Sequence, residues 1–449
     1  MKKIFQYIML AVVTIVMASC TSDIEETTAT TGKSNVQLVV GEFPAFGDSQ
    51  TRAIGTPDEG KTSWAEGDEL ILEIAKTSYG RHSATFTYNG KSWELTSGEL
   101  VYLEGDPAYI PHVYYAPNYK WEAGKLVLKE GKDPGTDEYI EGNARITGNS
   151  ETITVSFAEA TRKYSRLRIA TLPNEQITVD TEYFTPAGSS DMEQEGNYTL
   201  TSDEKGNAYL YGTFENNSEV TVKYREAALT TYTFSQATES AKSYALDATV
   251  ISANSSEEIK SAIEQKVADG KTTIRLNLAP NAGTNEFMAI REAIKGAAPN
   301  DLGTIELTII GVETIPEEAF YKMLQLKSVR MSDVKEIKKY AFKECQYLTV
   351  VEAPSLNKLY SGAFKDCDQL AKLTFGPINY ADARNWPIFE YITPNIDLIL
   401  SDYQKEMIET DSYLYTANND RDYAGSDEHN SKNFLGREFR SITCRYKVK

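Results

Sequence analysis

The first half of the chain, residues 36–251, consists of short hydrophobic runs separated by turns rich in Gly, Asn, Asp and Pro. Apolar and polar residues alternate within many of these runs, and Tyr, Thr and Val are frequent, as is typical of strands with one buried face. No long stretch with a 3.6-residue period precedes residue 254. The pattern predicts an antiparallel β-sandwich of one lobe, or of two lobes that meet near residue 160.

A local signal in this half is the pair Asn89-Gly90, which lies between the hydrophobic runs 84–88 and 92–95. The pair predicts a β-hairpin with a type I′ turn, because that turn requires a positive φ at both of its central residues.

In the second half, a hydrophobic pattern repeats every 22 residues over three units. Six positions recur in all three units, which chance does not explain. A repeat of this length with this Leu and Ile spacing is typical of a leucine-rich repeat solenoid. One unit cannot bury its apolar positions alone, so we expect the units to stack around one continuous core. The predicted core positions are Ile315, Ala319, Phe320, Leu326 and Val329 in the first unit, Ile337, Ala341, Phe342, Cys345, Leu348 and Val351 in the second, and Leu359, Ala363, Phe364, Cys367, Leu370 and Leu373 in the third.

Segments on both sides of the repeats are predicted to close the ends of the stack. Ile259, Ile263 and Val267 share one face of a predicted helix, and Ser255 precedes it as a cap. Repeats and flanking segments together form a predicted domain of residues 254–449 with a helical N-terminal cap. The predicted flanking elements are helices at 256–268 and 285–295 and strands at 273–278, 305–310, 396–400 and 434–446.

Residues 1–19 have the pattern of a lipoprotein signal peptide: Lys2 and Lys3 precede an apolar run that is too short for a comfortable membrane span. The following Ala18-Ser19-Cys20 resembles a lipobox, at which bacterial lipoproteins are acylated on the Cys and cleaved before it. Cys20 is therefore the predicted lipidation site, with palmitate as an expected acyl group; the alternative is an ordinary secretory cleavage site. Residues 20–35 are acidic and almost free of apolar residues, which predicts a flexible tether.

The net charge and the acidic stretch near the start of the chain limit the classes of partner and indicate a location. The chain has 65 acidic and 46 basic side chains, a net charge of −19, which argues against nucleic acid as a partner. The acidic stretch directly behind Cys20 resembles the surface-export signal of outer-membrane lipoproteins, although a solvated linker has the same composition. We therefore expect a cell-surface protein of the outer membrane that contacts the membrane through its lipid anchor only.

The sequence contains no P-loop, dinucleotide-binding, zinc-protease or nucleophile-elbow motif. Its histidines, His82, His112 and His429, are isolated, and its four cysteines form no paired metal-binding motif. A stretch that begins at Asp420 faintly resembles a calcium loop, but its spacing does not match an EF-hand. We therefore expect no enzyme activity, no cofactor and no metal.

Several short motifs between residues 35 and 250 resemble the fimbrillin-like family of surface lipoproteins. They are Thr51-Arg52-Ala53, the segment 64–68 before a strand, the pair 155–157 and 167–169, and the segment 241–246. The resemblance implies a Greek-key sandwich related to pilus subunits. In true pilins, proteolysis after an Arg frees a groove for a neighbour's strand. Arg52 is the matching candidate for processing, and a simple loop arginine is the alternative.

The repeat arrangement Ile-x-x-x-Ala-Phe-x-x-Cys-x-x-Leu-x-x-Val resembles the BspA-type leucine-rich repeat over about residues 310–376. The resemblance implies a bacterial surface protein that adheres to host matrix and to other microbes. Met323 stands in the Cys column of the first unit, and Glu318 and Tyr340 replace a glycine that Gly362 keeps. We expect these departures to leave the fold intact.

Two pairs in the repeats invite specific predictions. Arg330 and Glu352 lie opposite each other on the outward face and are predicted to form a cross-strand ion pair. Cys345 and Cys367 stack one repeat apart in the core, where two reduced thiols are expected, although the spacing also permits a disulfide.

The outward columns contain no aromatic ladder. The densest aromatic group of the first half is expected to pack between strands rather than to bind a ligand: Tyr109, Tyr114, Tyr115, Tyr119 and Trp121.

Together these features predict a lipoprotein that acts as a non-enzymatic adhesion or interaction protein. The expected partners are host extracellular matrix or other surface proteins, bound through the solenoid. The alternative is an accessory or tip subunit of a fimbria, whose sandwich polymerises with neighbouring fimbrial subunits. An enzyme that acts on glycans is a third hypothesis.

Replacing Cys20 by Ala is expected to release the protein from the membrane fraction, because each buried methylene of an acyl chain contributes about 0.8 kcal/mol to membrane binding. The measurement is fractionation of expressing cells followed by immunoblotting. Ser19→Ala, which keeps a small residue before the Cys, is the matched control and should stay in the membrane. Membrane retention of Cys20→Ala equal to that of the wild type contradicts the prediction.

Overall fold

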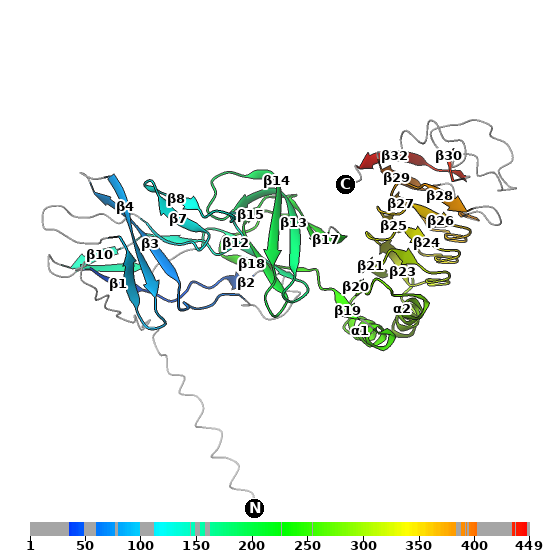
Figure 1. The fold of residues 1–449 in the computed structure, drawn as a ribbon, viewed down its shortest axis with the longest axis horizontal. Helices are drawn as coiled ribbons and strands as arrows, with labels where there is room; N and C mark the ends of the chain where they lie inside the picture. Colours follow the sequence, from blue (N-terminus) through cyan, green and yellow to red (C-terminus); the bar gives the residue numbers. More distant parts are fainter. Residues whose placement is uncertain are drawn as a thin grey trace, which may run out of the picture.

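The computed structural model describes residues 36–48, 60–76, 80–98, 112–143, 145–148, 153–157, 162–225, 227–253, 255–382, 388–390, 392, 395–401, 433–435 and 437–446. Over these residues the protein is mainly β, with two helices near the start of the second half (Figure 1). Neither of these helices is long and apolar enough to cross a membrane. Several predictions concern residues outside the described ranges, namely the leader and tether, Cys20, Arg52, Tyr109, the Asp420 loop and His429.

The strands before residue 160 are β1 (Val36–Val40), β2 (Gly47–Asp48), β3 (Glu69–Lys76), β4 (Gly80–Tyr88), β5 (Trp93–Ser97), β6 (Val113–Tyr115), β7 (Tyr119–Glu122), β8 (Lys125–Leu128), β9 (Ile140–Gly142), β10 (Arg145–Gly148) and β11 (Ile153–Phe157). All of them except β2 form a five-stranded sheet in the order β5-β4-β3-β6-β9, a three-stranded sheet β1-β11-β10 and the pair β7-β8. Leu38, Leu72 and Phe86 are fully buried in one hydrophobic cluster between these strands. We call this part the first lobe.

The strands from residue 165 to residue 247 are β12 (Ser165–Ala170), β13 (Gln176–Pro186), β14 (Glu193–Thr201), β15 (Asn207–Phe214), β16 (Glu219–Tyr224), β17 (Ala227–Thr233) and β18 (Lys242–Asp247). Together with β2 they form a sheet in the order β17-β16-β13-β15-β12-β18-β2, and β14 pairs with β13. Val179 and Phe214 are fully buried in its hydrophobic cluster. We call this part the second lobe; β17 is the edge strand of its sheet.

The two lobes correct the prediction of a purely antiparallel sandwich. β1 runs parallel to β11, and β18 runs parallel to both β12 and β2. The partners in each parallel pair are far apart in sequence, which supplies the long connection that parallel pairing needs. Local alternation of residues cannot reveal such pairings. Greek-key connectivity and the predicted domain boundaries stay predictions.

The predicted hairpin between β4 and β5 is confirmed, but its turn type is wrong. Tyr88 pairs with Trp93, so the loop has four residues, and only Gly90 among them has a positive φ, of 86°. The side chain of Asn89 shapes this loop, because its Oδ1 accepts hydrogen bonds from the backbone N–H groups of Lys91 at 2.9 Å and Ser92 at 2.8 Å. Asn is therefore used here for its side-chain acceptor and not for a left-handed backbone.

The described chain from residue 251 onward forms a stack of parallel coils, which we call the repeat stack (Figure 1). The predicted helices and the strands that precede the repeats are confirmed within one or two residues, and Ser255 caps the first helix by accepting from Glu258 N–H. Its elements are β19 (Ile251–Ala253), α1 (Ser256–Ala268), β20 (Thr273–Leu278), α2 (Thr284–Ala297), β21 (Ile305–Ile310), β22 (Thr314–Ile315), β23 (Leu326–Arg330), β24 (Glu336–Ile337), β25 (Val350–Ala353), β26 (Lys358–Tyr360), β27 (Lys372–Phe375), β28 (Tyr380–Asp382), β29 (Asp397–Ser401), β30 (Asn433–Phe434), β31 (Arg437–Glu438) and β32 (Ser441–Tyr446).

Three hydrogen-bonded ladders join the coils. An eight-stranded parallel sheet runs β19-β20-β21-β23-β25-β27-β29-β32, and a four-stranded parallel sheet runs β22-β24-β26-β28. Between the sheets, the turns bond to one another: Phe320 N–H donates to Ala341 O, and Phe342 N–H donates to Ala363 O, both at 2.8 Å. Backbone groups are thus satisfied by the next coil, as a buried turn requires.

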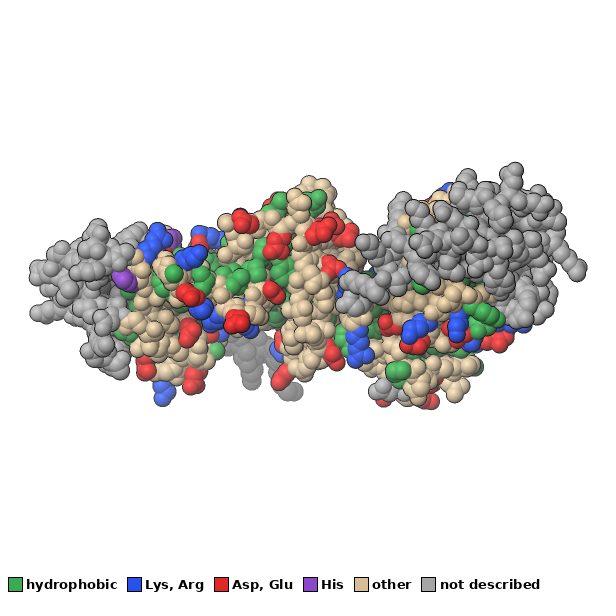
Figure 2. All heavy atoms as spheres, turned by 45° about the horizontal axis from the view of Figure 1, so that its top comes forward, with side chains coloured by type: hydrophobic (Ala, Val, Ile, Leu, Met, Phe, Trp, Pro, Cys, Tyr) green, Lys and Arg blue, Asp and Glu red, His purple; other side chains and the backbone are tan. Residues whose placement is uncertain are grey.

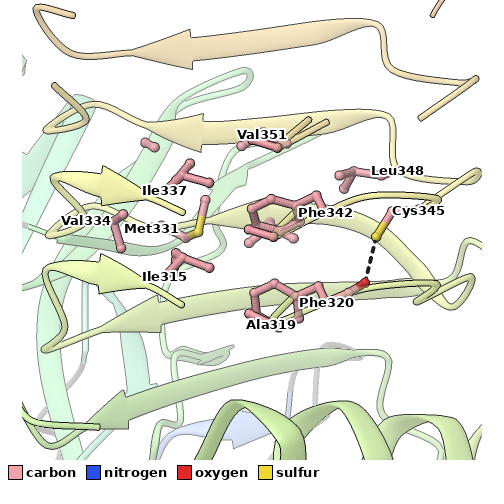
Figure 3. Packing of buried hydrophobic residues seen from close by; sticks show 14 of the residues in the cluster. Ile315, Ala319, Phe320, Met331, Val334, Ile337, Phe342, Cys345, Leu348 and Val351 are labelled. Carbon is pink, nitrogen blue, oxygen red and sulfur yellow. Dashed lines mark hydrogen bonds between the residues drawn. The ribbon is translucent and has the colours of Figure 1, made fainter. Parts of the chain in front are cut away.

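The space between these ladders holds the largest hydrophobic cluster of the protein's described residues. The rings of Phe320 and Phe342 stack with centroids 5.0 Å apart, and those of Phe342 and Phe364 stack at 5.3 Å. Figure 3 shows Phe320 and Phe342 one above the other, with Ile315 and Ile337 stacked in the same way beside them. All the predicted core positions of the three units are buried. Residues 22 apart therefore occupy equivalent places in successive coils.

The turns between coils use a left-handed backbone at two columns of the repeat, residues 318, 340 and 362 and residues 322, 344 and 366. Glu318, Tyr340 and Gly362 have φ values of 55°, 57° and 63°. A side chain in this conformation costs about 1–2 kcal/mol per residue. At Gly362 a Cβ atom would also lie 2.4 Å from Cε1 of Tyr340, so the glycine has a packing reason as well as a conformational one.

Gly362→Ala is expected to lower the free energy of unfolding by about 1–3 kcal/mol, because the new Cβ adds left-handed strain and meets the Tyr340 ring. Gly296→Ala is the matched control: Gly296 lies within α2 with open space around it, so this change should raise stability by about 0.5–1 kcal/mol. Urea denaturation of both variants measures the difference. Equal effects of the two substitutions would show that the left-handed column of Gly362 carries no strain.

Candidate binding site

The outward side of the eight-stranded sheet carries two rows of side chains that continue from strand to strand, and we call this surface the outward face. The residues between the rows, such as Leu307, Val329 and Val351, point inward and are buried. The first row comprises Thr273, Glu306, Ser328, Val350, Lys372, Asp397 and Ser441, and the second comprises Arg275, Thr308, Arg330, Glu352, Thr374, Ile399 and Thr443.

Two ion pairs on the outward face join neighbouring strands. Arg330 Nε donates to Glu352 Oε2 at 2.7 Å, which confirms the predicted cross-strand ion pair. Lys327 Nζ lies 2.7 Å from Glu306 Oε1 on the preceding strand. Figure 2 shows basic and acidic side chains interspersed over the visible part of the repeat stack. The face is therefore polar and of mixed charge.

A cavity of about 360 Å³ lies where the outward face approaches the second lobe. Strands β20, β21, β23 and β25 supply most of its lining, and Thr349 and residues 229–231 of the edge strand β17 supply the rest. Figure 1 shows β17 on the side of the second lobe that faces the repeat stack. The polar and charged lining residues are Thr230, Thr231, Thr273, Arg275, Glu306, Thr308, Lys327, Ser328, Arg330, Thr349 and Glu352.

Arg275 connects the two parts that form the cavity. Its side chain is only 7% exposed, and its Nε donates to the backbone oxygen of Leu229 at 2.7 Å. Burial lowers the pKa of Arg275 from its usual value; the negative charge of Asp247 opposes this shift, and the positive charge of Arg330 adds to it. Beside it, Ile310 of β21 is buried within the hydrophobic cluster of the second lobe. The hydrogen bond of Arg275 and the apolar packing of Ile310 therefore hold the repeat stack against the second lobe.

The sequence did not predict that residues 229–231 line a cavity. Leu229-Thr230-Thr231 belong to an ordinary alternating strand, and nothing in their spacing signals that they line a cavity with residues far along the chain. Arg275 and Thr308 had a weak signal, since both occupy polar positions within predicted buried strands.

Two members of the aromatic group of the first half, Tyr115 and Tyr119, are buried as predicted. Tyr115 is 4% exposed and makes edge contacts with Phe43 and Trp64. The hydroxyl of Tyr119 donates to Ala187 O at 3.2 Å. His82 and His112 stand on β4 and just before β6, and no group of three metal-ligating side chains occurs among the described residues.

The two repeat cysteines are free thiols in the core. Cys345 Sγ donates to Phe320 O, and Cys367 Sγ donates to Phe342 O, each at 3.0 Å (Figure 3 shows the first of these). Burial raises the pKa of the Cys345 thiol to about 12 and raises that of Cys367 as well. Protonated, hydrogen-bonded thiols of this kind are inert packing groups.

Residues 302–409 match, in six copies, the family model described as "BspA type Leucine rich repeat region". The match extends beyond the three predicted units on both sides. No curated protein matches the chain, and no solved structure matches it. No family match supports the resemblance of the first half to fimbrillin-like proteins, which stays a prediction.

Cys345 and Cys367 are expected to resist a thiol reagent in the folded protein even at pH 9, because the pKa values of both lie above that pH and the thiols are fully buried. After unfolding in guanidinium without reductant, both should label. Mass spectrometry of a Cys20→Ser, Cys444→Ser background counts the two thiols, since Cys444 is half-buried and complicates the native count. Failure of both to label after unfolding would show a disulfide.

Proposed function

We propose that this protein, whose residues 302–409 form a BspA-type leucine-rich repeat region, is a cell-surface lipoprotein that binds other macromolecules through the outward face. The repeat stack is, in this proposal, a leucine-rich repeat solenoid. The two lobes are a fimbrillin-like sandwich that presents it, and the chain catalyses no reaction.

The observation that carries the proposal is the register of the outward face. Two rows of side chains run without a slip across β23, β25 and β27, and the residues between them are locked in the core. A surface fixed in this way loses little side-chain and backbone entropy when a partner binds. Repeat stacks use extended faces of this kind for recognition.

The proposed location rests on the sequence. The lipobox-like Ala18-Ser19-Cys20 and the acidic residues behind it are the features that support an outer-membrane anchor. At the cell surface, host extracellular matrix and other surface proteins are the partners within reach of the outward face.

Charge reversal on the outward face is expected to weaken binding of a matrix protein by about tenfold or more. The variant is Lys372→Glu with Thr374→Glu, two outward residues of β27. The matched control is Lys223→Glu with Thr221→Glu, two outward residues at the same spacing on β16 of the second lobe. The measurement is surface plasmon resonance of the purified chain on immobilised fibronectin, laminin and collagen.

A loss of binding in the β16 control but not in the β27 variant would assign recognition to the second lobe. Absence of matrix binding together with ladder-like oligomers of the wild type would favour the alternative, an accessory or tip subunit of a fimbria.

A further inference from the structure

The lining of the cavity carries one positive charge in excess. Three of its side chains are cationic, Arg275, Lys327 and Arg330, and two are carboxylates. Lys327 pairs with one carboxylate and Arg330 with the other, as described above. Arg275 is the cation that has no partner among the lining carboxylates.

Asp247 of the second lobe, which is not part of the lining, forms an ion pair with Arg275 but no hydrogen bond. The distance from Arg275 Nη1 to Asp247 Oδ1 is 3.8 Å, longer than a hydrogen bond. That same carboxylate oxygen accepts from Thr249 N–H at 2.9 Å and from the Thr249 hydroxyl at 2.6 Å. Among the described residues, the Nη1 and Nη2 groups of Arg275 therefore make no hydrogen bond. A largely buried guanidinium whose terminal donors are open to the cavity can bind an anion there.

Arg330 supplies a second guanidinium to the same place. The register aligns Arg275, Thr308 and Arg330 on three neighbouring strands, so the two arginines flank Thr308 about 9.5 Å apart at their Cα atoms. Arg330 uses Nε for Glu352, and its Nη groups make no hydrogen bond within the described part of the chain. Two long side chains at this distance can direct donors to one carboxylate between them.

The remaining lining is rich in hydroxyl groups. Six of the lining residues are Thr or Ser, and each hydroxyl can both donate and accept. The volume of about 360 Å³ falls within the range of small-molecule sites. A polyhydroxylated ligand matches such a lining better than an acidic peptide, whose carboxylate side chains offer no hydroxyl groups.

We propose that this cavity binds an acidic sugar residue of a glycan, with its carboxylate between Arg275 and Arg330 and its hydroxyl groups against the threonines. Two guanidinium groups whose Nη donors make no hydrogen bond within the described residues fit one carboxylate. A doubly charged phosphate would meet repulsion from Glu306 and Glu352, which line the same cavity. The inference deepens the proposed function and rests on it for the surface setting in which a glycan is met.

The test uses the purified chain, N-acetylneuraminic acid and glucuronic acid as probes, and their methyl esters and N-acetylglucosamine as uncharged comparisons. Isothermal titration calorimetry and saturation-transfer NMR should show binding of at least one acid and binding about tenfold weaker for its ester. Arg330→Gln should weaken binding of the acid by about tenfold or more. The matched control is Lys335→Gln, which removes a cation paired with Glu313 away from the cavity and should change nothing.

Thermal unfolding of each variant separates loss of the site from loss of the fold, and Thr308→Val provides a second cavity variant that keeps all charges. Equal affinity for acid and ester, unchanged binding in Arg330→Gln, or no binding of either acid would overturn the inference. If no acid binds but matrix proteins still bind through β27, this inference fails while the proposed function stands. If the acid binds and matrix binding is absent, this inference stands while the proposed function fails.

Discussion

The structure of the second half depends on the stacking of equivalent apolar residues from one 22-residue unit on those of the next. The rings of Phe320, Phe342 and Phe364 lie face to face at 5.0 and 5.3 Å, close to the spacing of strands in a sheet. No single coil has a core of its own, so each is stable only because its neighbours cover it. The helices α1 and α2 provide that cover at the start of the stack, where Ile259, Ile263 and Phe287 join the same cluster.

The same stacking positions the outward face. A strand whose inward residues are locked in register must present its outward residues in register too, since side chains alternate along a strand. The ion pair of Arg330 with Glu352 and the approach of Arg275 to Thr308 and Arg330 are consequences of this alignment. The second lobe then closes one part of the face, because Arg275 holds the backbone of β17. A cavity arises there.

Much of the repeat stack could be predicted because its hydrophobic residues recur every 22 positions. Spacing alone identified the buried columns and even the pairing of Arg330 with Glu352. The same spacing also extends to Leu307, 22 residues before Val329, and to Ala381, 22 after Leu359, but a three-unit comparison overlooked both. The strand pairing of the two lobes was harder to predict. Alternation of apolar and polar residues predicts strands but not their partners, so the parallel pairs were not predicted. The contribution of β17 to the cavity depends on tertiary packing, which has no periodicity in sequence.

The claim on which this account depends is that the stack fixes the outward face before any partner arrives. Native-state hydrogen exchange of the purified chain, followed by mass spectrometry, tests this directly. The account predicts that the amides of β21, β23, β25 and β27 are the slowest to exchange in the second half and that they exchange together, through cooperative unfolding of the stack. Rapid or strand-by-strand exchange of these amides under native conditions would contradict it, because the face would then have to be ordered by its ligand.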